Sequence, residues 1–383
     1  MAAADAQLFW LSATVPNDQF LVYGFAGDPD LDAGIGRLRR TAERIGDLRL
    51  RVADDRRWHW PRWETCQISP EQFVVHPHRP GWPEAAARLT PLDATRAAWR
   101  VHVFPPRTVV VQISHALGDG TRSSALAAAL FGRHGPIPPI PAPDRGFLPR
   151  RAIAAARAHR ELPPGNPPRP ASSVNATPTA TPVLRSLLVG AETLRRPTVT
   201  VGALAAISEA LGGYLGARGE EIGALGAEIQ ISGPTPLACN NFRTTNVGLY
   251  PKLDRCARAE RIARELADRR LAVREAAWAA SAAAVESMPP ALLRWGTRRF
   301  DPGRRSPTVA GHTVVSSVNR GAADLSFGGA PVAFTAGFPQ LSPMMSLTHG
   351  VHGIGRTVAI SIRADPVNVD VDEYRQRLAR ALE

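Results

Sequence analysis

The chain has 383 residues, of which 44% are hydrophobic and 21% are charged, so it is long enough for two domains and apolar enough to bury a core in each. Its formal charge of +12 is carried almost entirely by arginine, and only 6% of the residues are aromatic. Because no zinc-finger or RNA-binding motif accompanies this charge, we expect no nucleic-acid partner. Three scattered cysteines and the lack of an uninterrupted apolar run of about 18 residues argue against a disulfide framework and a membrane span.

We expect a cytoplasmic protein, with a peripheral position on the inner face of the membrane as the alternative. The N-terminal segment, with its early Asp5, has no basic region of the kind that signal peptides carry. The positive surface would attract CoA phosphates, anionic lipid or an acidic carrier protein. The pairs His76–His78 and His349–His352 have metal-ligand spacing, but no carboxylate or cysteine pattern supports them. We therefore expect no metal site and place these four histidines on the surface or in loops.

The first part of the chain alternates between strand and helix patterns. Asp30 is placed to cap one helix, and Gly132 is placed to end another. Predicted helices cover residues 5–11, 30–45 and about 120–131, and predicted strands cover residues 20–25, 48–52, 73–75, 101–104 and 108–114. The last two strands are predicted to form a hairpin.

Composition changes between residues 135 and 182, where proline is dense. Because proline removes backbone donors and fixes φ, we interpret this stretch as a crossover linker. It contains one basic helix, predicted over residues 149–161. A solvated linker helix is our interpretation of it, and docking to a membrane or an acidic partner is the alternative.

The second part again mixes helices and strands, which predicts a two-lobed α/β (α+β) protein. Predicted helices cover residues 197–215, 254–285 and 371–382, and predicted strands cover residues 183–189, 228–232, 312–318, 332–334, 344–348 and 358–364. The expected division is an N-terminal lobe over residues 1–135, a linker over residues 136–182 and a C-terminal lobe over residues 183–383.

The clearest candidate chemistry follows the strand 108–114. There His115, Asp119 and Gly120 form the pattern H-x-x-x-D-G. Histidine serves as a general base near neutral pH without tuning. Asp119 can brace the turn by accepting backbone N–H groups or by pairing with an arginine, and Gly120 permits a tight bend. The residues alone equally allow a structural histidine at a strand end.

The segment SHALGDG (residues 114–120) resembles the H-H-x-x-x-D-G site of the bacterial wax ester synthase/diacylglycerol acyltransferase family (WS/DGAT). This family belongs to the superfamily of chloramphenicol acetyltransferases and condensation domains. Residues 92–99, 199–220, 240–251 and 315–331 resemble further family segments in the same order. The resemblance implies two chloramphenicol-acetyltransferase-like lobes, each a mixed sheet with helices, and an active-site tunnel at their interface.

The chain departs from the family pattern at several positions. Ser114 replaces the first histidine of the family's pair, and Gly202 and Ala203 replace an Asn-Asp pair. The resemblance implies an acyltransferase in which His115 is the general base and Asp119 holds the loop, by pairing with an arginine. The acyl donor would be acyl-CoA or an acyl carrier protein, used as a co-substrate, and no cofactor would be permanently bound.

Further candidates would contact substrate. Ser316, Ser317 and Asn319 are our candidate donors for the oxyanion of the transition state. Ser114 and Asn241 are the remaining candidates, although Asn241, like its neighbour Asn240, also suits a turn.

Three functions remain open from the sequence. The first is transfer of a fatty acyl group from acyl-CoA to an alcohol. The second is an acyltransferase or condensation-type enzyme of specialised metabolism, which takes a carrier-bound or small acyl thioester and an alcohol or amine. The third is a non-catalytic relative that binds a lipid or a partner in the former tunnel.

Overall fold

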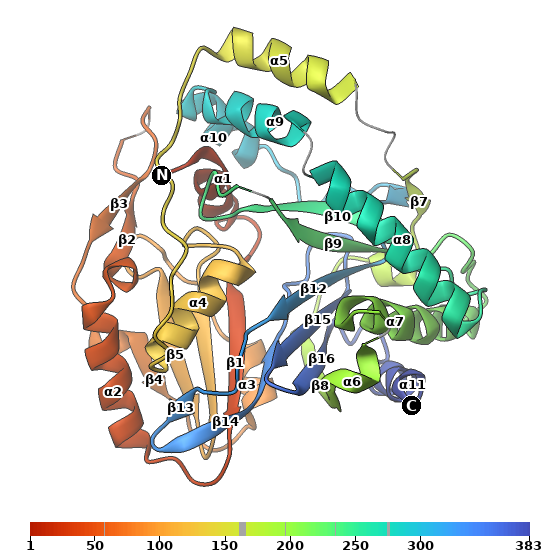
Figure 1. Cartoon of the computed structure of the whole chain (residues 1–383), viewed down its shortest axis with the longest axis horizontal. Coiled ribbons are helices and arrows are strands. Elements are labelled where there is room, and N and C mark those ends of the chain that lie inside the picture. The colour runs from red at the N-terminus through yellow and green to blue at the C-terminus, as the bar shows by residue number, and fades with distance from the viewer. Residues whose placement is uncertain (57, 161–165, 196, 234, 274–275) are drawn as a thin grey trace.

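The computed structural model describes residues 1–56, 58–160, 166–195, 197–233, 235–273 and 276–383. Two six-stranded sheets with helices on their outer faces form two lobes (Figure 1). The predicted mixed α/β architecture with two lobes is therefore confirmed.

The first sheet has the strand order β13-β14-β1-β6-β5-β4. Its strands are β1 (Gln19–Phe25), β4 (Phe73–Val75), β5 (Trp99–Phe104), β6 (Thr108–Ile113), β13 (Ser326–Phe327) and β14 (Ala330–Gly337). Helices α2 (Leu31–Arg44) and α4 (Gly120–Leu130) cover its outer face, where Leu38 and Leu126 join the buried apolar cluster of the strands. Asp30 caps α2 as predicted, since its Oδ1 accepts from the Ala33 N–H at 2.9 Å.

The second sheet has the strand order β10-β9-β12-β15-β16-β8. Its strands are β8 (Val183–Gly190), β9 (Gly226–Ser232), β10 (Phe242–Gly248), β12 (Thr313–Asn319), β15 (Leu347–Ile354) and β16 (Thr357–Ala364). Helices α7 (Val199–Gly216), α8 (Arg255–Val273) and α11 (Val371–Leu382) cover its outer face. Among the described residues, α7 alone is long and apolar enough to cross a membrane, but 67% of it is buried in this lobe's core.

The two lobes are joined by strands and by their inner faces. Strands β13 and β14 belong to the second part of the chain but complete the first sheet, where β14 pairs antiparallel with β1. Phe20 and Val22 of the first sheet share a buried cluster with Leu184 and Ala359 of the second. A Cβ on Gly350 in β15 would collide with the carbonyl oxygen of β14 residue 337, so only glycine permits this backbone contact.

Two features differ from the expected division at residues 135 and 182. Residues 326–337 belong to the first sheet, although they lie in the second part of the chain. Ser173–Asn175 forms a short 3-10 helix whose Val174 is buried in the core of the second lobe, although it lies in the expected linker. The connection from β12 to β14 therefore joins the second lobe to the first sheet. The residues around Val174 hold the crossover to the core of the second lobe.

The remaining elements lie around these sheets. They are α1 (Ala3–Leu11), β2 (Leu50–Ala53), β3 (Arg62–Thr65), α3 (Trp82–Ala87), α5 (Leu148–Arg160), β7 (Arg169–Pro170), α6 (Ala191–Leu194), α9 (Ala276–Glu286), α10 (Pro290–Arg298), β11 (Thr308–Val309) and the 3-10 helices Gly46–Arg49 and Pro70–Gln72. The sequence predicted α5 but not β3, α3 or α10. It predicted one helix over 254–285, whereas the structure describes α8 and α9 separately, with residues 274–275 outside the described ranges.

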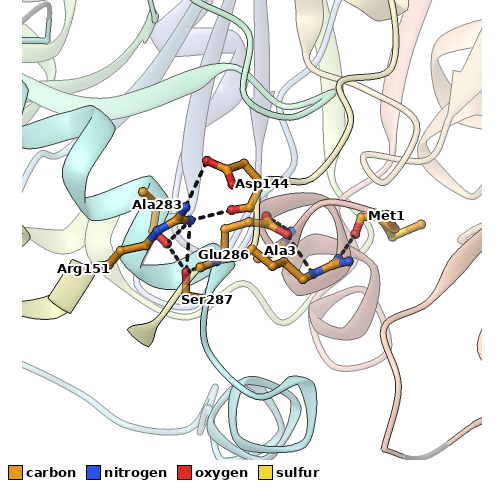
Figure 2. Close-up of polar contacts among 9 residues, drawn as sticks. Met1, Ala3, Asp144, Arg151, Ala283, Glu286 and Ser287 are labelled. Carbon is orange, nitrogen blue, oxygen red and sulfur yellow. Dashed lines mark hydrogen bonds and ion pairs between the residues drawn. The ribbon is translucent and has the colours of Figure 1, made fainter. Parts of the chain in front are cut away.

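Polar contacts fasten the crossover and α1 to α9 (Figure 2). The guanidinium of Arg151 contacts the side chains of Asp144 and Ser287. Arg145 forms an ion pair with Glu286 at 3.3 Å, and the Ala3 N–H donates to the same carboxylate at 2.6 Å. The start of α1 is therefore fixed by a carboxylate from the other half of the chain.

The expected surface position was wrong for two histidines. His349 and His352 lie on β15 and are buried. The ring of His349 lies 2.8 Å from the Thr313 hydroxyl and 2.9 Å from the Tyr374 hydroxyl. The segment LTHGVHGI carries glycines that suggest a loop, but it forms a central strand, on which the His349 ring finds partners inside the lobe and the His352 Nδ1 is buried without a hydrogen bond to any described residue.

Candidate active site

The H-x-x-x-D-G segment forms a turn between β6 and α4. Ser114 is buried, donates its backbone N–H to the Ala98 carbonyl at 2.8 Å, and accepts the Ala116 N–H on its hydroxyl at 3.3 Å. These bonds shape the turn, so the Ser114 side chain is engaged by the protein itself. His115 follows it and is half-buried, with its ring near that of Phe242 on β10.

Asp119 ties the turn to the second lobe. Its Oδ1 accepts the backbone N–H groups of Thr121 and Arg122 at 3.0 Å each and thereby caps α4. Its Oδ2 accepts the backbone N–H of Asn241 at 3.0 Å, and its own N–H donates to the Cys239 carbonyl at 3.2 Å. One buried carboxylate thus holds the helix start and the segment before β10 together.

The expected arginine partner of Asp119 was wrong. Among the described residues Asp119 forms no ion pair. The nearby Arg122 is almost fully buried and pairs with Asp47 at 3.0 Å, while its Nε donates to the Leu117 carbonyl at 2.8 Å. Backbone donors satisfy Asp119 instead, because the α4 N-terminus presents two unpaired N–H groups to it.

Asn240 binds His115 twice across the lobe boundary. The Asn240 Oδ1 lies 2.7 Å from the His115 Nδ1, and the Asn240 Nδ2 donates to the His115 carbonyl at 2.6 Å. Asn240 is in turn held by Asp5 of α1, whose Oδ1 accepts its backbone N–H at 2.9 Å and its Nδ2 at 2.8 Å. The other Asp5 oxygen accepts the Cys239 N–H at 3.0 Å.

These bonds determine which nitrogen of the imidazole carries the proton. The Asn240 Nδ2 is committed to two acceptors, a carboxylate and a carbonyl, so the amide oxygen must face His115. That oxygen can only accept, so the neutral ring is protonated on Nδ1 and its Nε2 is a free base. The arrangement is the one that a general base requires.

Burial tunes both ends of this chain of hydrogen bonds. Burial lowers the pKa of His115 below its ordinary value of 6.5, whereas its hydrogen bond to Asn240 and the charge of Asp119 act in the opposite direction. Burial raises the pKa of Asp5, although the donors on its oxygens oppose this shift. His115 is therefore neutral, and ready to accept a proton, at neutral pH.

The remaining predicted residues lie on two faces of β12 and beside β10. Ser317 shares a 2.8 Å hydroxyl–hydroxyl bond with Thr200, and Asn319 accepts the Gly321 N–H at 3.0 Å, so both serve the second lobe locally. Ser316 has the opposite orientation on the strand and is half-buried. Asn241 contributes its backbone to Asp119, and its side chain donates to the Gly233 carbonyl.

Gly120 lies where the lobes approach one another. A Cβ on Gly120 would stand 3.1 Å from Val318, which shares its strand face with Ser316. A cavity of about 280 Å³ lies beside this contact, between Ser124 of α4 and Asn319 at the end of β12. The structure thus brings His115, Asp119, Gly120 and Asn241 together. Ser316 lies on the face of the second sheet that approaches Gly120.

Sequence reasoning missed Asp5 as a site residue and left Asn240 undecided. Asp5 is distant in sequence from every other member of the site, and no local pattern marks it. The consecutive residues Cys239, Asn240 and Asn241 carried the one available signal, because paired asparagines are unusual in an element and suit a fixed turn.

Comparisons with solved structures identify the fold. No family model and no curated protein sequence matches the chain. The wax ester synthase/diacylglycerol acyltransferase from Marinobacter aquaeolei VT8 is similar with a TM-score of 0.62 and 17% identity, over 99% of this chain and 97% of that one. The first condensation domain of the CDA synthetase is similar with a TM-score of 0.60 and 15% identity, over 100% and 94%.

A third structure is the starter condensation domain of rhizomide synthetase RzmA, in a mutant form in complex with C8-CoA and Leu-SNAC. Its TM-score is 0.58 at 15% identity, over 100% of this chain and 92% of that one. At these identities the likeness establishes the fold, and it confirms the resemblance noted from the H-x-x-x-D-G segment at that level. The chain has the two-lobed fold shared by the wax ester synthase/diacylglycerol acyltransferase and the condensation domains.

Proposed function

We propose that this protein transfers a fatty acyl group from acyl-CoA to the hydroxyl group of an alcohol, with His115 as the general base. The observation that carries the proposal is the double contact between His115 and Asn240, which fixes Nε2 as the free nitrogen of the ring. A structural histidine at a strand end would need no such control of its tautomer.

The reaction requires one proton to move twice. The His115 Nε2 removes the hydroxyl proton of the acceptor as its oxygen attacks the thioester carbonyl. The tetrahedral intermediate then expels the CoA sulfur, the C–S bond breaks, and the imidazolium returns the proton to the leaving thiolate. No acyl-enzyme forms in this mechanism, because the acceptor oxygen attacks the thioester carbonyl directly.

The oxyanion needs a donor near the attacked carbonyl. Ser316 is the candidate among the three predicted side chains, because Ser317 and Asn319 are engaged by Thr200 and Gly321. Its strand face is the one on which Val318 approaches Gly120 at the start of α4. Asp119 does not take part in proton transfer in this scheme; it holds the turn and the segment before β10 in register.

The second candidate function is transfer to an amine, with a carrier protein or a small acyl thioester as donor. It is favoured by the similarity to the starter condensation domain that was crystallised with C8-CoA and Leu-SNAC. The same His115 would remove the proton of the attacking amine. The formal net charge of +12 suits CoA phosphates and an acidic carrier protein equally.

A thiol-release assay separates these functions. The purified chain is supplied with acyl-CoAs of rising chain length, including octanoyl-CoA, and with panels of alcohols and amines. We expect CoA release that depends on an alcohol and falls by about 10²–10⁴-fold in His115→Ala. His78→Ala, an exposed histidine outside the site, is the matched control and should retain full activity.

Three outcomes would redirect the proposal. Turnover that needs an amine or a loaded carrier protein would favour the second function. Activity that survives in His115→Ala would remove the histidine from the mechanism. No thiol release with any donor and acceptor, together with tight lipid binding, would favour the non-catalytic relative.

A further inference from the structure

A second interlobe feature is independent of His115. Arg363 lies on β16, on the inner face of the second sheet, the face on which Ala359 of the same strand joins the buried cluster between the lobes. Only 9% of Arg363 is exposed. Among the residues that the structure describes, its buried Nε has no hydrogen-bond partner, and no carboxylate lies within ion-pair distance of its guanidinium.

Such a side chain is unusual. Buried arginines are normally paired, because an arginine stays charged and a charge is poorly solvated inside a protein. Arg122 and Arg258 show the ordinary solution in this chain, since each pairs with a carboxylate and donates to a backbone carbonyl. Around Arg363, the ring of Phe20 is the one cation–π contact, at 5.8 Å.

The guanidinium lines a cavity of about 210 Å³ between the lobes. The wall from the first lobe is made by Phe20, Leu89 and Pro91, and the wall from the second by Pro182 and Leu341. Gln340 is the polar neighbour of Arg363 in this lining. A single positive group therefore faces a small and otherwise mainly apolar space.

The electrostatics are consistent with an unsatisfied cation. Burial alone lowers the pKa of Arg363 to about 10, and no neighbouring carboxylate raises it. The guanidinium nevertheless remains charged at neutral pH, so the cavity holds one positive charge whose counter-ion the chain does not supply. The nearest comparison on the same sheet is Arg185, which pairs with Asp372 at 3.2 Å.

We propose that this cavity binds a small molecule that has one carboxylate on an apolar body, with the carboxylate on Arg363. A guanidinium matches a carboxylate with two parallel hydrogen bonds. One cation in an apolar wall suits a single negative charge better than a phosphate dianion, which needs several donors. The volume lies below the range of about 300–1,000 Å³ typical of drug-sized ligands, which favours a short aliphatic or aromatic acid.

The site is distinct from the candidate active site. His115, Asn240 and Asp119 are absent from the lining of this cavity. The two sites are nevertheless neighbours along β1, because Gln19 binds the carbonyl of Gly118 in the His115 turn while the next residue, Phe20, lines the cavity. Binding at Arg363 can therefore be measured without any acyl donor, and its failure would not affect the acyl-transfer proposal.

Isothermal titration of the full chain with hexanoate and benzoate tests the site, with hexanol and inorganic phosphate as comparison ligands. We expect the acids to bind, and hexanol and phosphate to bind at least about tenfold more weakly, because each lacks either the charge or the apolar body. The acids should also raise the melting temperature.

Two variants assign the binding to this cavity. Arg363→Met keeps the length of the side chain without its charge, and should abolish acid binding without lowering the melting temperature, because it replaces an unpaired buried charge by an apolar group. Leu89→Trp should also abolish binding by filling the cavity while Arg363 is intact. Arg185→Met removes an arginine from the neighbouring strand and should bind the acids as the natural chain does.

The proposal is overturned if the acids bind equally well to Arg363→Met or to Leu89→Trp. It is also overturned if inorganic phosphate binds more tightly than hexanoate, or if neither acid binds to the natural chain at millimolar concentration.

Discussion

Asn240→Ala is the sharpest test of how the active site is organised. The substitution removes the acceptor of the His115 Nδ1 proton and the donor to the His115 carbonyl in one step. It leaves the backbone N–H of residue 240 and that of Cys239 on the Asp5 carboxylate. The histidine would then lose control of both its tautomer and its ring orientation.

The size of the effect follows from the contacts that are lost. A reacting group displaced by about 1 Å can lose about 10²-fold in rate, so we expect kcat to fall by about that factor, with KM changed by less than about threefold. Leaving the two His115 groups without partners should lower the free energy of unfolding by about 1–3 kcal/mol. The fall in rate therefore exceeds what partial unfolding would cause.

The pH profile separates a positioning role from a merely structural one. The hydrogen bond to Asn240 raises the pKa of His115 against the effect of burial, so its removal should lower that pKa further. Because neutral histidine is the active form, the acid limb of kcat/KM should move to lower pH in Asn240→Ala. The assay is thiol release from octanoyl-CoA with the best alcohol, measured between pH 4.5 and 8.

Asn241→Ala is the matched control. Its side chain donates to the Gly233 carbonyl, and the bond that matters to Asp119 comes from its backbone. We expect a rate and a pH profile close to those of the natural chain. Asn240→Ala with an unchanged rate and an unchanged acid limb would refute the assignment of Asn240 as the residue that orients the base.

Three further predictions concern other buried groups. Asp5→Asn places an amide against the backbone N–H donors of Cys239 and Asn240, so kcat should fall while KM stays within about threefold. Kinetics with saturating octanoyl-CoA would measure this, and an unchanged kcat would contradict it. Burial lowers the pKa of His102 to about 4, whereas the unfolded chain takes up the proton near 6.5. Lowering the pH from 7 to 5 should therefore reduce the contribution of His102 to the free energy of unfolding by about 2 kcal/mol, measured in urea titrations as the change in the difference between the natural chain and His102→Gln. A difference that is equal at both pH values would refute this. Asp47→Asn leaves the buried Arg122 without its charge partner, and calorimetry should show a free energy of unfolding lower by about 1–3 kcal/mol. This is less than the cost of breaking a fully buried pair, because Asp47 is partly exposed. A loss below about 0.5 kcal/mol, typical of surface pairs, would show that the pair is not needed for stability.

The strand, turn and helix around His115 could be predicted because their signals are local. The apolar run of β6, the cap at Asp119 and the positive φ of Gly132 after α4 all lie within one short segment. The two-lobed α/β fold also follows from the order of such segments. Each depends on contacts between residues that are close in sequence, where periodicity and capping residues carry the information.

The rest of the site depends on contacts that no local pattern encodes. Asp5 and Asn240 meet from opposite halves of the chain, and their bond exists only once α1 has been placed against the segment before β10. Asp119 pairs with no arginine among the described residues, because backbone N–H groups bind both of its carboxylate oxygens, and the neighbouring Arg122 pairs instead with Asp47 in the turn before β2. Only the assembled lobes decide such choices among similar charges.

The insertion of β14 beside β1 has a consequence for synthesis. A ribosome releases β1 early and both β13 and β14 near the end, so the first sheet lacks two of its strands during most of translation. Until then β1 presents an unpaired edge, the kind of edge that pairs with other chains, and the contact that closes it is among the most distant in the sequence. The N-terminal lobe, although made first, must therefore be completed late, and a nascent chain that stalls before residue 330 should aggregate rather than remain as a folded half.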